Sequence, residues 1–203
     1  MKKKINNSII LASNSPRRKK LLEQIDLIFD VIPSNIHETT DLDLAPSLFV
    51  EHYAHEKAHH VANSNENKWV IGADTVVVFD KKIFGKPKNK SESYEMLNSL
   101  SGNIHKVYTG VSIQNKKKGI VSNFHEKTEV EFNTLTNSDI CYYIDRYKPF
   151  DKSGSYGIQD GFSIHIKRIN GCYYNVMGLP LAKFYDNFSR LISKKSKTQV
   201  INI

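Results

Sequence analysis

The chain has 203 residues, of which 39% are hydrophobic, and its 29 Lys and Arg residues outnumber its 21 Asp and Glu residues, giving a formal net charge of +8. This length and apolar content predict one self-sufficient globular domain and exclude a disordered chain. Two separated cysteines, Cys141 and Cys172, exclude a disulfide framework and a thiolate metal site. The positive charge favours anionic partners in general, and we expect no specific nucleic-acid partner from it.

No part of the sequence has the roughly 18 unbroken apolar residues that a membrane-spanning helix needs. The short apolar stretch after the first lysines is soon followed by Arg17 and Arg18, which is unlike a secretory signal. We therefore expect a cytoplasmic protein that does not associate with membranes.

The first predicted elements form a β-α-β unit. A short buried strand is expected at Ile9–Ala12, a helix at Pro16–Ile25 and a second strand at Phe29–Ile32. Apolar residues then recur with a 3.6-residue period over Pro46–Ala62, which predicts an amphipathic helix.

The rest of the chain continues the alternation of strands and helices. Strands are expected at Val70–Phe79, Ile83–Phe84, Lys106–Ile113, Ile120–Phe124, Thr128–Phe132, Phe162–Ile169 and Cys172–Met177. Helices are expected at Ser91–Leu100, after the capping pair of Thr136 and Asp139, and at about Leu181–Ile192. Asn170 and Gly171 predict a tight hairpin turn. These patterns favour one mixed α/β domain with both parallel and antiparallel strand pairs.

The start of the first helix breaks a local rule. Ser15 is a good N-cap and Pro16 suits the first helical position, but four cations follow at once, from Arg17 to Lys20. Cations oppose the positive end of the helix dipole. This arrangement predicts a phosphate site at the turn, and the alternative is a solvated basic turn with no ligand.

Two more charges fall where apolar residues are expected. Lys57 lies on the apolar face of its helix, where it either reaches out to water or enters a cleft from the core side. Asp74 lies inside a strand rich in valine, where an unpaired charge would be very costly. It is either an acid satisfied by backbone N–H groups at a strand end or a catalytic carboxylate.

Six motifs and a closing tripeptide, taken together, resemble the Maf family of nucleoside triphosphate pyrophosphatases. They keep the family's order and spacing over about residues 8 to 185. The motifs are Leu11 to Arg18, Gly72 to Thr75, Gly85 to Pro87, Leu100 to Gly102, Thr109 to Val111, Asp151 to Gln159 and Gly178 to Pro180.

The resemblance implies an α/β fold of the Maf and inosine-triphosphatase-like kind, in which a mixed, strongly bent sheet is flanked by helices around a central cleft. We expect a single domain of two lobes over residues 1–203, with frayed ends at about 1–6 and 194–203, and a homodimer. The implied activity is hydrolysis of dTTP and UTP to the monophosphate and pyrophosphate by metal-assisted attack of water on the α-phosphorus. The alternative is a nucleotide-binding regulator of cell division, acting in septum formation with little turnover.

The resemblance also implies roles for individual residues. Asp74 matches the proton acceptor, and Arg17, Thr75 and Gln159 match the positions that distinguish the dTTP and UTP branch from the branch acting on 7-methyl-GTP. Glu38 and Asp74 are expected to bind the divalent metal, Mg²⁺ or Mn²⁺. The residues expected to bind the triphosphate are Ser13, Arg17, Arg18, Lys57, Lys86 and Lys152. The chain departs from the usual family pattern at His37, Ser153, Ser155 and Asp160.

Overall fold

The structure is a computed structural model that describes residues 8–39 and 42–193. The ends expected to be frayed, 1–6 and 194–203, lie outside the described residues. The division of the domain into two lobes stays a prediction.

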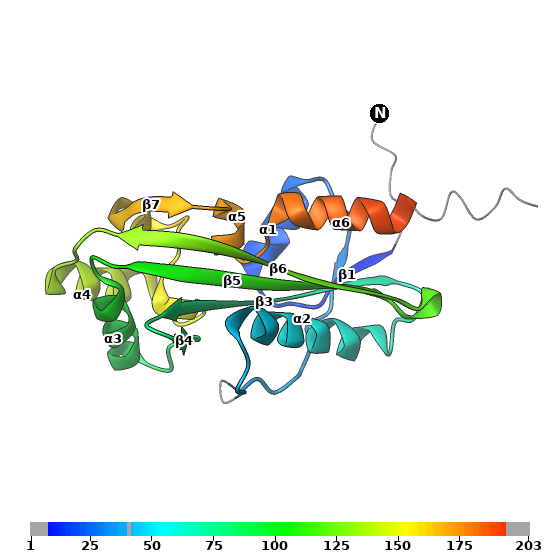
Figure 1. The fold of residues 1–203 in the computed structure, drawn as a ribbon, viewed down its shortest axis with the longest axis horizontal. Helices are drawn as coiled ribbons and strands as arrows, with labels where there is room; N and C mark the ends of the chain where they lie inside the picture. The colour runs from blue at the N-terminus through cyan, green and yellow to red at the C-terminus, as the bar shows by residue number, and fades with distance from the viewer. Residues whose placement is uncertain (1–7, 40–41, 194–203) are drawn as a thin grey trace, which may run out of the picture.

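A seven-stranded mixed sheet forms the centre of the molecule, with strand order β2-β1-β3-β5-β6-β7 and β4 paired to β3 (Figure 1). Strand β1 is parallel to both β2 and β3, and all other pairs are antiparallel. The strands are β1 (Ile9–Leu11), β2 (Asp30–Val31), β3 (Trp69–Phe79), β4 (Lys82–Phe84), β5 (Ile104–Asn115), β6 (Ile120–Phe132) and β7 (Ile166–Asn170). The prediction of a mixed sheet is therefore confirmed.

Helices cover both faces of this sheet. The helices are α1 (Pro16–Gln24), α2 (Pro46–Ala62), α3 (Lys90–Leu100), α4 (Asn137–Tyr147), α5 (Tyr173–Val176) and α6 (Leu181–Ser193). Figure 1 shows α2 along one face, α1 and α6 on the other, and α3 and α4 at one end of the sheet. Alternate residues of β1 divide between the two sides, because Ile9 and Leu11 join the core with α1 and α6 whereas Ile10 packs with α2.

Helix α2 lies so close to the sheet that two strand positions have no room for a side chain. A Cβ atom at Gly110 of β5 would collide with the backbone of Val50, and one at Gly72 of β3 would collide with the backbone of Ala54 and Ala58. This close approach brings the side chain of Lys57, on the same helix, down to the sheet.

We expect Gly110→Ala to lower the free energy of unfolding by about 3 kcal/mol, because the atoms that the new methyl group meets are backbone atoms that cannot rotate away. The control is Gly119→Ala, at a glycine with a φ of +61° and nothing within 4 Å of the added Cβ. It should cost about 1 kcal/mol, from the left-handed backbone alone. Urea unfolding of both variants tests this, and equal losses would contradict the close packing of α2.

Two predicted strands prove to be one. The polar residues between Phe124 and Thr128 interrupt the apolar pattern, but β6 pairs with β5 without a break, from Ile120 opposite Asn115 to Glu131 opposite Ile104. The prediction of separate strands was wrong because a long antiparallel partner satisfies the backbone of the polar stretch as well.

The predicted hairpin at Asn170 and Gly171 is also wrong. The segment after it forms the short helix α5, and the buried Asn175 side chain donates hydrogen bonds to the carbonyl oxygen of Val107 and to Thr128 Oγ1. These contacts with β5 and β6 hold the segment against the sheet, and they outweigh the local turn preference. The strand before the turn is also shorter than predicted, because residues Gly161–His165 form a 3₁₀-helix.

Candidate active site

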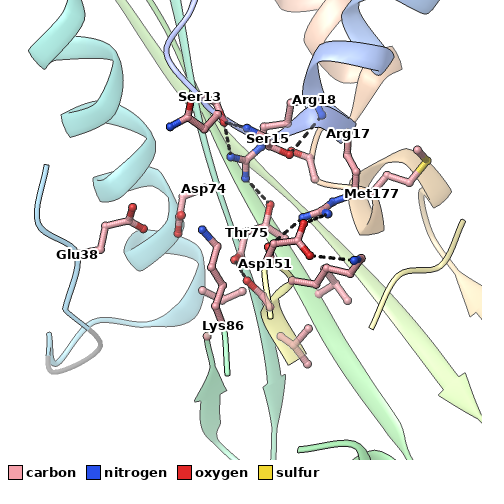
Figure 2. A pocket seen from close by; sticks show the side chains of 18 of the residues that line it. Ser13, Ser15, Arg17, Arg18, Glu38, Asp74, Thr75, Lys86, Asp151 and Met177 are labelled. Carbon is pink, nitrogen blue, oxygen red and sulfur yellow. Dashed lines mark hydrogen bonds and ion pairs between the residues drawn. The ribbon is translucent and has the colours of Figure 1, made fainter. Parts of the chain in front are cut away.

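A cavity of about 670 Å³ opens between the N-terminus of α1, the middle of β3 and the segment that follows α4. All ten site residues expected from the sequence line this cavity: Ser13, Arg17, Arg18, Glu38, Lys57, Asp74, Thr75, Lys86, Lys152 and Gln159. The basic tip of α1 and the acid in the valine-rich strand therefore face the same hollow (Figure 2). Its volume is in the range of pockets that bind small molecules.

The tip of α1 is built around Arg18. Ser15 caps the helix, since its Oγ accepts a hydrogen bond from the backbone N–H of Arg18. The Arg18 guanidinium donates to the carbonyl oxygen of Gly178, to Ser13 Oγ and to Thr75 Oγ1 at 2.8, 3.1 and 2.9 Å. It thereby ties the loop after β1 to strand β3.

Electrostatics link Arg18 to the acidic side of the cavity. Burial lowers the pKa of Arg18, and the negative charge of Asp74 opposes this change. An arginine keeps its charge under such conditions. Two of its five N–H donors have no acceptor among the described residues.

Arg17 points to the other wall of the cavity, where it meets Asp151. Its Nη1 atom lies 2.6 Å from Asp151 Oδ2, and its Nη2 atom donates to the carbonyl oxygen of Asp151 at 3.2 Å. Lys152 Nζ donates to the other carboxylate oxygen of Asp151 at 2.9 Å. Partial burial raises the pKa of Asp151, but the hydrogen bonds from Lys152 and Arg17 outweigh burial and hold this pKa below its usual value.

An ion triad with two buried members, Lys57 and Asp74, and one exposed member, Glu38, occupies the acidic side of the cavity. Lys57 Nζ lies 2.7 Å from Asp74 Oδ1 and 2.9 Å from Glu38 Oε2. The side chains of Lys57 and Asp74 are only 10% and 9% exposed, whereas Glu38 is 44% exposed. Lys57 therefore enters the cavity from the core side and does not reach out to open solvent, and its charge offsets two carboxylates that would otherwise repel each other.

The remaining expected residues differ in how firmly they are held. Thr75 Oγ1 accepts from Arg18 and lies 3.0 Å from Thr109 Oγ1, so its hydroxyl is fixed from two sides. Lys86 points into the cavity in Figure 2 and has no ion-pair partner among residues 8–39 and 42–193. Gln159 is exposed at the cavity and makes no side-chain hydrogen bond within the described part of the chain.

The acidic side fits a divalent cation. Glu38 and Asp74 each give one carboxylate oxygen to Lys57 and keep a second oxygen that receives no hydrogen bond from the described residues. Hard carboxylate oxygens of this kind suit Mg²⁺ or Mn²⁺. No group of three or more His, Cys, Asp or Glu residues converges within the described chain, so the remaining ligands would be water and substrate oxygens, as is usual for Mg²⁺.

Several residues of the cavity were not expected from the sequence. Asp151, which orients Arg17, lies in a motif that was noted, but an exposed acid next to a lysine gives no sign of its distant partner. Tyr156 also lines the cavity, and behind it the buried His105 ring places Nε2 2.8 Å from the Tyr156 hydroxyl. His105 Nδ1 has no hydrogen-bond partner among the residues that the structure describes, which is costly for a buried polar atom.

His105 should make the protein sensitive to acid. Burial lowers its pKa from 6.5 to about 3, so below pH 6.5 the unfolded chain binds a proton that the folded chain does not. The free energy of unfolding therefore falls as the pH is lowered from 6.5 towards 3, by up to about 1.4 kcal/mol per pH unit. When the pH is lowered from about 6.5 to about 4.5, we expect the free energy of unfolding to fall by about 2 kcal/mol less in His105→Gln than in the parent. Urea titrations at both pH values test this, and equal losses would contradict it.

Comparison with known proteins shows to which family the chain belongs. The family model described as "Maf-like protein" matches residues 8–191. The chain belongs to the Maf family. The Maf chain is 49% identical to the dTTP/UTP pyrophosphatase of Bacillus mycoides strain KBAB4 over 175 residues. This alignment covers 86% of this chain and 91% of that protein. The chain is 48% identical over 175 residues, with the same two coverages, to the protein of that name from Bacillus anthracis.

Two solved structures align with the Maf chain at low TM-score and low sequence identity. The Staphylococcus aureus Ham1 protein aligns with a TM-score of 0.43 at 15% identity, over 62% of this chain and 72% of that one. The nucleoside-triphosphatase (dITP/XTP pyrophosphatase) of Mycobacterium abscessus aligns with a TM-score of 0.44 at 7% identity, over 94% of this chain and 100% of that one.

Proposed function

We propose that this Maf protein is a nucleoside triphosphate pyrophosphatase that hydrolyses dTTP and UTP to the monophosphate and pyrophosphate. The observation on which this depends most is the shared cavity, in which Asp74 and the cationic tip of α1 face each other. Relatives that are 47 to 49% identical and are named dTTP/UTP pyrophosphatase support the choice of substrate.

Asp74 is the proposed proton acceptor. Water that attacks the α-phosphorus must lose a proton, and a carboxylate in the cavity wall can take it. Lys57 holds Asp74 Oδ1 at 2.7 Å, and Oδ2 receives no hydrogen bond from the described residues. The two lone pairs of Oδ2 would serve the metal and the proton of the attacking water. Lys57 thus orients the acceptor and compensates its charge.

The cations around the cavity are proposed to hold the triphosphate and to neutralise the departing pyrophosphate. Arg17 offers a planar guanidinium, Lys86 offers an ammonium without an ion-pair partner among the described residues, and Ser13 adds a hydroxyl. Arg18, Lys57 and Lys152 are proposed for the same role, and each of them, like Arg17, already has partners within the described chain.

The bound metal, Mg²⁺ or Mn²⁺, would be held by Glu38 and Asp74 and would supply positive charge at the phosphate oxygens. At the other end of the substrate, Gln159 presents an amide with both a donor and an acceptor, which suits the edge of a pyrimidine. Arg17 and Thr75 are the other two residues proposed to make the protein select dTTP and UTP.

We also propose a cytoplasmic homodimer. In support, Ile28 is 79% exposed beside the edge strand β2, and Val31 and Ile32 are 41% and 38% exposed. Within the described residues, no helix combines the length and the apolar character needed to cross a bilayer. Sedimentation equilibrium of the full chain tests the dimer, and a monomer at high concentration would contradict it.

Purified protein incubated with dTTP or UTP and Mg²⁺ tests the proposed activity. We expect monophosphate and pyrophosphate in equal amounts, and loss of both products when the metal is chelated. Tight dTTP binding with no monophosphate formed over hours would contradict the proposed hydrolysis and favour the alternative, a nucleotide-binding regulator of cell division. If the nucleotide neither binds nor reacts, the proposed function is wrong.

A further inference from the structure

Four side chains of alternating charge, Arg17, Asp151, Lys152 and Asp160, follow one another along the cavity wall. Arg17 Nη1 and Lys152 Nζ hold the two oxygens of Asp151 at 2.6 and 2.9 Å. Lys152 Nζ also lies 3.9 Å from Oδ2 of Asp160. Asp151 and Lys152 thus connect Arg17 to Asp160, the residue that follows Gln159.

Asp160 is fixed by further hydrogen bonds from the core side. The buried Tyr143 hydroxyl lies 3.1 and 3.2 Å from its two carboxylate oxygens and accepts from the backbone N–H of Gly157 at 3.0 Å. Burial raises the pKa of Tyr143, and the charge of Asp160 adds to this, so the hydroxyl stays a donor. Asp160 Oδ1 also accepts from the backbone N–H of Phe162 at 3.0 Å.

These contacts close the turn from Gly157 to Asp160 on itself. A Cβ atom at Gly157 would collide with Asp160 Oδ2 and would lie 3.0 Å from Lys152 Cε. The carboxylate of Asp160 therefore packs directly on the backbone of Gly157. Gln159, which stands between the fixed positions, is left free to point outward at the cavity.

We propose that Asp160 is a positioning residue for base selection, because it locks the turn from which Gln159 reaches the cavity at a set place relative to Arg17. This inference rests on the proposed function and assigns a part of its substrate recognition. With its backbone held in place, Gln159 would distinguish uracil from cytosine, which differ at the edge that carries N3 and the group at position 4.

The test compares UTP with CTP, since they share the sugar and the triphosphate. The variants are Asp160→Ala, which removes the carboxylate and all its contacts, and Asp160→Asn, which keeps an acceptor oxygen but removes the charge near Lys152. The control is Asp139→Asn, because Asp139 is another capping carboxylate, bound to Thr136 at the start of α4 and absent from the cavity lining. Both kcat/KM and the dissociation constant are measured for each nucleotide.

We expect the parent to prefer UTP and Asp160→Ala to lose about tenfold of this preference, with a smaller loss in Asp160→Asn and none in Asp139→Asn. If Asp160→Ala does not fold, Gly157→Ala gives the same test by displacing the carboxylate. An unchanged UTP to CTP ratio in the folded variants, or no preference in the parent, would overturn the inference. If the parent releases no pyrophosphate, the proposed function fails, and the ratio of dissociation constants still decides the role of Asp160.

Discussion

Asp74→Asn should lower kcat for dTTP hydrolysis by about 10²- to 10⁴-fold, the range that a positioned proton acceptor contributes. The amide has nearly the shape of the carboxylate but cannot take a proton from water. Asp74 is 6% exposed and bound to Lys57, so the amide should stay in place and dTTP should still bind. Pyrophosphate release under saturating dTTP measures kcat, and calorimetry measures binding.

The control for this variant is Asp145→Asn, the same substitution in the exposed ion pair between Lys90 and Asp145. It should leave kcat unchanged. Retention of more than a third of the parent kcat by Asp74→Asn would show that another group accepts the proton.

Lys57→Met should lower the free energy of unfolding by about 3 to 5 kcal/mol, because it leaves Asp74 buried without its cation. The side chains of both residues are only 10% and 9% exposed, so water can replace the lost partner only from the side of the cavity. Activity should fall as well, since Lys57 orients the carboxylate. Denaturant unfolding and pyrophosphate release measure the two effects.

A double variant separates the lost ion pair from lost packing. Lys57→Met combined with Asp74→Asn removes the unpaired charge, so it should be more stable than Lys57→Met alone. Lys90→Met removes the cation of the exposed Asp145 pair and should have no measurable effect on stability. If the double variant is less stable than Lys57→Met, the buried charge is not the cause.

The parts of the site that break a local rule could be predicted from the sequence. A lysine on an apolar helix face and an acid among valines are costly unless something compensates them, and the structure pairs Lys57 with Asp74 at 2.7 Å. The span of α2 was also predicted, because a 3.6-residue period and a proline at its first position both specify it.

The charge chain along the cavity wall could not be predicted in this way. Asp151 and Asp160 are polar residues in an irregular segment, where an acid breaks no rule. Arg17, the partner of Asp151, is 134 positions away in the sequence. The hairpin prediction at Asn170 and Gly171 failed for a related reason, since the contacts of Asn175 with β5 and β6 are long-range and leave no local pattern.

The central claim is that water attacks the α-phosphorus of a pyrimidine triphosphate at Asp74. The most direct test is hydrolysis of dTTP in ¹⁸O-labelled water, followed by mass spectrometry of both products. The account predicts one labelled oxygen in dTMP and none in pyrophosphate. Label in pyrophosphate, or release of orthophosphate in its place, would contradict it.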